Sequence, residues 1–117
     1  MPIRIFNKTK NTIISPNAQI ADTPFSRLKG LLGRDGLAAG EALVITQCRS
    51  IHMFFMRFAI DVVFVDKNNR VVGTVKRIQP FGLSPYFWRA TKALELPEGT
   101  IEGTRTMPGD EVVVERV

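Results

Sequence analysis

The sequence predicts a mostly β domain of the α+β class: a small antiparallel β barrel or strongly curved sheet with one short helix. Apolar residues recur with period two, or in short continuous runs, along most of the chain. Gly, Pro and Asn break these runs at spacings typical of a mostly β domain. A convincing helical spacing occurs once. The 117 residues suit a single domain over residues 1–117, and the 44% hydrophobic fraction can supply its core.

The N-terminal region is expected to hold two short strands. Residues 3–6 form the first, and a polar turn over residues 7–11 follows. The β-branched run that begins at Thr12 favours a second strand over residues 12–15, which Pro16 is expected to end.

The helix is expected over residues 24–32. Asp22 or Thr23 can cap its free N–H groups, and Pro24 lies where a missing N–H is harmless. Gly30 lies inside this range, where it predicts a close approach of the helix to a strand. One apolar face is expected from Phe25, Leu28, Leu31 and Leu32.

After the helix, the pattern predicts strands over residues 42–46 and 49–53. A β-hairpin is expected from residues 60–65 and 70–76, because Asn68-Asn69 tolerates positive φ at its tip.

The C-terminal third begins with a proline-restricted loop over residues 79–89, expected to form either an aromatic wall of a site or a plug at the end of the barrel. A strand over residues 93–96 follows. Residues 107–110 read Met-Pro-Gly-Asp, which is typical of a type II turn before a closing strand over residues 111–116. The loop's aromatic residues are Phe81, Tyr86, Phe87 and Trp88.

The charge and the termini limit the classes of partner and location. Lys and Arg number 16 against 11 Asp and Glu, which makes this a basic protein of net charge +5. The basic residues are scattered singly or in pairs, so nucleic acid is not the expected partner; a small anionic ligand or a protein is. There is no signal-peptide core and no transmembrane segment, so a cytoplasmic location is expected.

The segment 48–61 is the densest in side chains that can carry chemistry. If it is a strand, Cys48, Ser50 and His52 share one face and form a possible nucleophile and base. Cys48 and His52 are the only residues of their kinds, so a structural zinc site is not expected, and neither is another cofactor. Asp61 interrupts an apolar strand and is expected to be buried and bonded to backbone donors or to an ion-pair partner: Arg57, Arg49 or His52.

Several motifs, in this order, resemble the domain-of-unknown-function family 192, a prokaryotic family of small proteins. They are Gly30-Leu31-Leu32-Gly33-Arg34, Ser50-Ile51-His52-Met53, the run from Ile60 to Asp66, Leu94-Glu95, Gly99 and Gly109-Asp110. The resemblance implies a compact, mostly antiparallel β domain with a short helix, and no activity. The positions that it carries over are Arg27, Gly30, Arg34, Met53, Asp61, Glu95 and Asp110. The commoner branch of the family has Trp at the position of His52, which argues against His52 as a catalytic centre.

The expected function is therefore that of a small non-enzymatic binding or accessory domain. No complete catalytic set is visible, so catalytic residues stay unassigned. One alternative is a small hydrolase or thiol enzyme that uses Cys48 and His52, with Asp61 or Glu95 orienting the base. A second alternative is an RNA-binding barrel with stacking aromatic rings. The candidate binding residues are His52, Arg57, Asp61, Trp88, Arg34 and Glu95.

Overall fold

The computed structural model describes residues 3–117, apart from the side chains of Pro24, Phe25 and Leu28. Seven strands form one sheet in the order β5-β4-β6-β3-β2-β1-β7. Neighbouring strands are antiparallel, except β2 and β3, which are parallel. The strands are β1 (Ile3–Asn7), β2 (Thr12–Ala21), β3 (Glu41–Thr46), β4 (Ile60–Asp66), β5 (Val71–Ile78), β6 (Ala90–Pro97) and β7 (Val112–Arg116).

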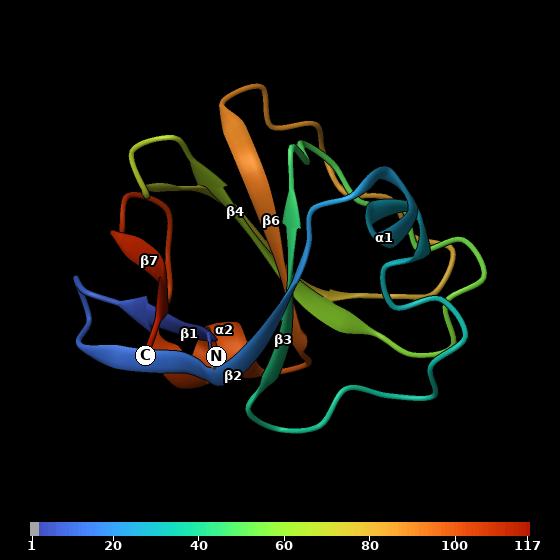
Figure 1. The fold of residues 1–117 in the computed structure, drawn as a ribbon, viewed down its shortest axis with the longest axis horizontal. Coiled ribbons are helices and arrows are strands. Elements are labelled where there is room, and N and C mark those ends of the chain that lie inside the picture. The colour runs from blue at the N-terminus through green and yellow to red at the C-terminus, as the bar shows by residue number, and fades with distance from the viewer. Residues whose placement is uncertain (1–2) are drawn as a thin grey trace.

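The sheet curls until its two edge strands meet at one end (Figure 1). The N–H of Val71 donates to the carbonyl of Asp110 at 2.9 Å, and the N–H of Val112 donates to the carbonyl of Asn69 at 2.8 Å. These bonds join the start of β5 to the start of β7, which makes the sheet a half-barrel. The predicted fold class, a mostly β domain with a strongly curved sheet, is confirmed.

Both faces of the central strands are buried. Along β4, Val63 and Val65 belong to an inner core enclosed by the curled sheet, which also contains Ile101. Val62 and Phe64 belong to an outer core between the other sheet face and the covering loops. Alternate residues of one strand thus enter different cores, as the pleat of a β-strand requires.

Two short helices lie in different parts of the fold (Figure 1). Helix α1 (Pro24–Lys29) begins with a capping box between Thr23 and Ser26, and α2 (Thr100–Thr104) covers the inner core with Ile101. Helix α1 is three residues shorter than predicted because Gly30 takes φ +48° and ends it. The predicted apolar helix face rested partly on Phe25 and Leu28, whose side chains lie outside the described residues.

The structure corrects two further predictions and adds a helix. Strand β2 continues through Pro16, because the pairing with β1 shifts its register between Ile3 and Ile5 and tolerates the missing N–H there. Residues 49–53 are not a regular strand, because their backbone groups bond the irregular loop 79–89 and form only one bridge, from His52 to Leu83. Helix α2 was not predicted at all.

The carboxylate of Asp61 fixes α2 and the end of β5 onto the sheet. Its oxygens accept hydrogen bonds from the backbone N–H groups of Arg77 (2.9 Å), Gly99 (3.1 Å) and Ile101 (2.9 Å). Asp61 is 1% exposed, so the prediction of a buried side chain bonded to backbone donors is confirmed. The suggested partners Arg57, Arg49 and His52 are wrong, because backbone amides fill that role.

We expect Asp61→Ala to lower the free energy of unfolding by about 3 kcal/mol, because it leaves three backbone donors without their acceptor. Asp61→Asn keeps one acceptor oxygen and should lose less. Urea denaturation midpoints of the three proteins measure both effects. A midpoint unchanged in Asp61→Ala would contradict a structural role for this carboxylate.

Candidate functional site

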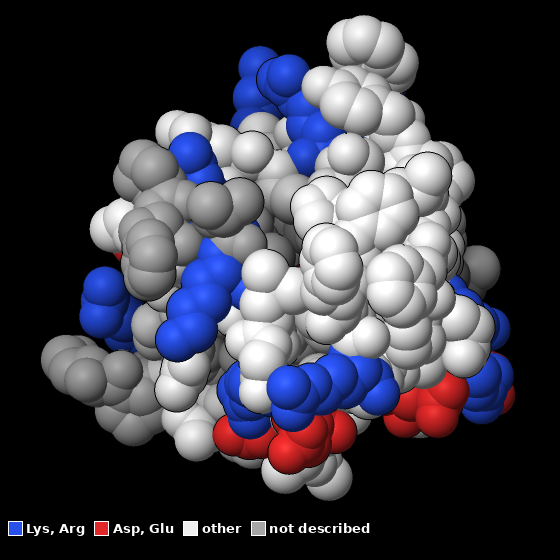
Figure 2. All heavy atoms as spheres, turned by 90° about the vertical axis from the view of Figure 1, so that its right-hand side faces the viewer, with Lys and Arg blue, Asp and Glu red and all other residues white. Residues whose placement is uncertain are grey.

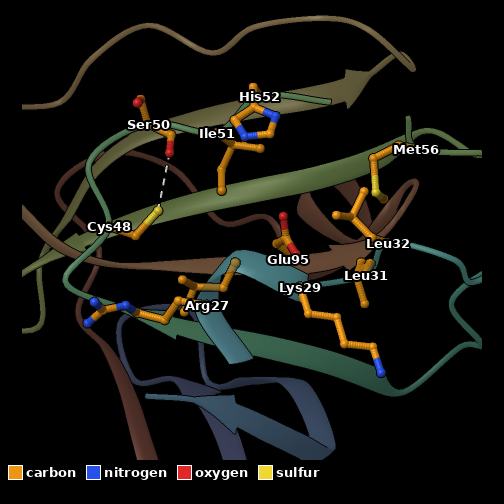
Figure 3. Close-up of a pocket in the computed structure, with 12 residues that line it drawn as sticks. Arg27, Lys29, Leu31, Leu32, Cys48, Ser50, Ile51, His52, Met56 and Glu95 are labelled. Atoms are coloured by element: carbon orange, nitrogen blue, oxygen red, sulfur yellow. Dashed lines mark hydrogen bonds between the residues drawn. The ribbon is translucent and has the colours of Figure 1, made fainter. Parts of the chain in front are cut away.

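A cavity of about 120 Å³ lies beneath the C-terminal end of α1 (Figure 3). Its floor is the outer face of β3 and β6, its near wall is the end of α1, and its far wall is the segment 48–52. Glu95 lies between these walls. The apolar part of the lining comes from Leu31, Leu32, Ile45, Ile51 and Met56.

Glu95 is a buried acid in the middle of an apolar sheet face. It lies on β6 directly between Leu43 of β3 and Val62 of β4, both of which belong to the outer core. Its side chain is 5% exposed. Burial raises the pKa of Glu95 from 4.5 to about 7, because a carboxylate is poorly solvated among hydrocarbon side chains.

The carboxyl group of Glu95 is also short of hydrogen bonds. Within residues 3–117, its Oε1 is the one buried side-chain oxygen or nitrogen atom with no partner. The other buried acids are well supplied: Asp61 has its three backbone donors, and Asp110 accepts from Asn7, Lys10 and the backbone of Met107. An unpaired buried acceptor destabilises the folded protein, so the stability of the fold does not explain why Oε1 of Glu95 is buried.

Gly30 allows the helix end to approach this acid. A Cβ atom at Gly30 would lie 3.8 Å from Oε1 of Glu95, in ordinary contact, but the φ of +48° disfavours any residue with a side chain. The N–H of Gly30 donates to the carbonyl of Ser26 at 2.9 Å. This termination of α1 places Arg27 and Lys29 at the rim of the cavity, where their side chains extend outward (Figure 3).

The opposite wall carries Cys48, Ser50 and His52. The thiol of Cys48 donates to the backbone carbonyl of Ser50 at 3.2 Å. Burial raises the pKa of this thiol, and the bond to Ser50 opposes the effect only in part. The ring of His52 is exposed and packs against that of Phe54, with centroids 5.1 Å apart. The described residues include no group of three or more His, Cys, Asp and Glu side chains that could hold a metal ion.

The six candidate binding residues do not form one site. His52 and Glu95 line the cavity. Arg57 forms an ion pair with Asp35 at 2.8 Å, and Arg34 forms one with Glu41 at 3.2 Å. Asp61 contacts α2, and the side chain of Trp88 is 78% exposed in the loop 79–89.

Of the other cavity residues, Arg27 was indicated by the family resemblance alone, and Gly30 by the resemblance and by its place inside the predicted helix. Lys29 and the apolar wall residues were missed. Their convergence depends on where α1 ends and on the irregular path of the segment 48–52, and neither feature has a periodic signal in the sequence.

The rings of the loop 79–89 do not all have the same role: one packs into the fold and the others are exposed. Phe87 packs on Phe64, with ring centroids 4.6 Å apart, and covers Gly73 so closely that a Cβ there would lie 2.1 Å from its ring. Phe81, Tyr86 and Trp88 are exposed. The loop therefore plugs the fold with one ring and presents three others to solvent.

The exposed rings of the loop do not line the Glu95 cavity. Phe54, Phe55 and Leu83 are also exposed on the covering loops. Figure 2 shows an uncharged area on the right of one face, with Lys and Arg side chains above, to the left and below it and Asp and Glu side chains along the lower edge.

No helix within the described part of the chain is long and apolar enough to cross a membrane.

Comparison with known proteins identifies the family. The model of DUF192, described as "Uncharacterized ACR, COG1430", matches residues 5–114. A UPF0127 protein of Thermococcus sibiricus is 34% identical over 112 residues, which cover 92% of this chain and 72% of the relative. UPF0127 protein PH1112 of Pyrococcus horikoshii is 33% identical over 111 residues, which cover 92% of this chain and 96% of the relative.

A crystal structure from Novosphingobium aromaticivorans, of a protein of unknown function, has the same fold. Its TM-score is 0.81 at 20% identity, and the match covers 97% of this chain and 84% of the other. The resemblance of the motifs, the family match over residues 5–114 and the two relatives agree. The chain therefore belongs to the DUF192 family.

Proposed function

We propose that this protein is a non-enzymatic binding domain whose Glu95 cavity takes a small ligand with a hydrogen-bond donor, most favourably an ammonium group. The unpaired Oε1 of Glu95 carries the proposal. It is an acceptor held inside a hollow, and its partner is missing from the residues around it.

The energetics favour a charged donor. An ammonium group beside Glu95 would stabilise the ionised carboxylate that burial now disfavours. The rise of its pKa from 4.5 to about 7 corresponds to roughly 3 kcal/mol of destabilisation in the ionised state. A ligand that reverses this shift gains part of that free energy on binding.

The rim adds a preference for a negative group on the same ligand. Lys29 is exposed and forms no ion pair within residues 3–117, and within the same residues the side chain of Arg27 donates only to the amide oxygen of Gln47, at 2.6 Å. Both side chains are long enough to turn toward a ligand at the cavity mouth. A small amino acid, with an ammonium group for Glu95 and a carboxylate for the rim, has this arrangement of charges.

The alternative of a thiol enzyme has one observation in its favour: a carboxyl group with a pKa of about 7 is suited to proton transfer near neutral pH. The environment of Cys48 favours binding instead. Its thiol donates to a backbone carbonyl, and its pKa is raised, whereas a nucleophilic cysteine is activated by a lowered pKa.

We expect small amino acids to raise the thermal midpoint of the protein, and the corresponding amines without a carboxylate to raise it less. Differential scanning fluorimetry with glycine, alanine, serine and ethylamine measures this. Affinity should fall about tenfold for each pH unit below 7, because protonation of Glu95 competes with the ammonium group.

The controls for this experiment are matched glutamates. Glu95→Gln should abolish the shift, whereas Glu98→Gln changes an exposed glutamate and should preserve it. The binding proposal fails if no compound shifts the wild type, or if the shift survives in Glu95→Gln.

Glu95 should also set part of the pH dependence of folding. Its folded pKa is raised, so its contribution to stability is fully present below pH 4.5 and is lost as the pH rises to about 7. Between pH 5 and pH 8 the wild type should therefore lose up to roughly 3 kcal/mol relative to Glu95→Gln. Urea denaturation across this range measures the difference, and parallel profiles would show that Glu95 is already paired.

Cys48 should behave as an ordinary or sluggish thiol. Because burial raises its pKa, we expect the rate of alkylation by iodoacetamide to rise with a midpoint above the ordinary pKa of a free cysteine thiol. Mass spectrometry of samples quenched at different pH values gives the profile. A midpoint below 7 would instead support the thiol enzyme.

A further inference from the structure

A second hollow, distinct from the Glu95 cavity, lies on the other side of Cys48. It consists of two adjoining depressions of about 580 and 450 Å³, which share Arg49, Ala90 and Thr91. The first extends to Tyr86, and the second extends to the turn between β4 and β5 at Lys67. We call this continuous depression the basic groove.

The groove is positively charged and its cations are free. Arg49, Lys67 and Arg89 line it, and none of the three forms an ion pair within residues 3–117. Asp66 is the acid among the described lining residues. Its Oδ1 already accepts from the backbone N–H groups of Asn68 and Arg70, at 2.8 and 2.9 Å, so it shapes the turn.

A pair of aromatic rings stands at one end of the groove. Tyr86 lines it, and Trp88 packs edge-on against Tyr86 with ring centroids 4.6 Å apart at 64°. The side chain of Trp88 is 78% exposed, so ring surface is open to a ligand.

Contacts of Phe87 fix the aromatic rings relative to Arg49. Between Tyr86 and Trp88, Phe87 is anchored on Phe64, and its N–H donates to the carbonyl of Arg49 at 2.8 Å. The N–H of Ala90 donates back to the carbonyl of Phe87 at 3.0 Å. The aromatic pair is thus positioned before any ligand arrives, which lowers the entropic cost of binding.

We propose that the basic groove binds single-stranded nucleic acid, with phosphates at Arg49, Lys67 and Arg89 and an unpaired base stacked on Trp88. A positive groove beside an open aromatic ring is the common arrangement for single strands, because every base has a flat face and every nucleotide has a phosphate. An acidic peptide would satisfy the cations but would leave the ring unused. A duplex keeps its bases stacked and offers no face to Trp88.

This proposal departs from the expectation drawn from the scattered basic residues of the sequence. The fold gathers cations from three separate segments: the loop before Ser50, the turn after β4 and the loop before β6. The proposal does not rest on the Glu95 cavity, because Glu95 does not line the groove; with no ligand in that cavity, Glu95→Gln should leave nucleic-acid binding unchanged.

The test is fluorescence anisotropy with labelled oligo(dT) and oligo(U) of about 12 nucleotides. With three phosphate contacts, the affinity of the wild type should fall roughly 20-fold between about 50 and 200 mM NaCl. Arg49→Gln with Arg89→Gln should weaken binding and flatten the salt dependence. The matched control, Lys76→Gln with Arg116→Gln, removes the same charge from residues outside the groove lining and should do neither.

The stacking contact has its own variants. Trp88→Ala should weaken binding by roughly 5- to 150-fold, and Trp88→Phe should restore much of it. Phe55→Ala, which removes another exposed ring outside the groove lining, should have no effect. Unlabelled oligo(dT) should quench the fluorescence of Trp88, the only tryptophan, which reports stacking in the unmodified protein.

The proposal fails if the wild type gives no anisotropy change at low salt, or if the groove and control double variants have equal effects. It also fails if Trp88→Ala binds as the wild type does, or if a duplex of the same length competes equally well. Competition by UMP, by polyglutamate or by vesicles containing anionic lipid at equivalent charge would assign the groove to a mononucleotide, an acidic peptide or a membrane surface instead.

Discussion

The burial of both faces of the central strands is the constraint on which the rest of the structure depends. Strands β4 and β6 lie side by side, and six of the seven residues of β4 and five of the eight residues of β6 are buried. A polar side chain placed there must enter one of two apolar layers, and the pleat decides which. Asp61 enters the inner layer, where α2 and β5 supply three donors. Glu95 enters the outer layer, where Oε1 finds none within the described chain.

The contrast between Asp61 and Glu95 distinguishes an acid with a structural role from a candidate for a functional role. A carboxylate whose oxygens accept hydrogen bonds from backbone amides stabilises the fold, because its removal leaves those buried amides without an acceptor. A carboxyl group with an unmet oxygen and a raised pKa does the opposite, since its ionised form destabilises the fold. Its retention in a core strand is understandable if a ligand completes its bonding. Gly30 is consistent with this view, because its φ of +48°, which would strain a residue with a side chain, ends α1 beside the acid.

The sequence predicted local features better than convergent ones. The turn at Pro108-Gly109 and the hairpin at Asn69 depend on φ preferences of a few residues, and both have the expected positive φ at Gly109 and Asn69. The predicted strand over residues 12–15 was too short, because Pro16 normally ends a strand. The register shift in the pairing with β1, which lets the strand continue, has no signal in the sequence. The thiol-enzyme alternative grouped Cys48, His52 and Glu95, which do line the cavity. The helix wall of the cavity and the groove were not predicted, because they are built from segments whose approach is set by the curl of the sheet.

The segment 47–50 gives the two proposed sites a common wall. Cys48 and Ser50 line both the Glu95 cavity and the groove, and the bond from the thiol to the carbonyl of Ser50 fixes the turn between them. Arg49, between these two residues, faces the groove and is tied to the aromatic loop through the N–H of Phe87. A ligand that moved this short segment at one site would therefore alter the position of a cation at the other. Because the segment makes irregular loop contacts and no regular sheet pairing, its displacement would disturb few backbone hydrogen bonds, which is the physical condition for coupling between neighbouring sites.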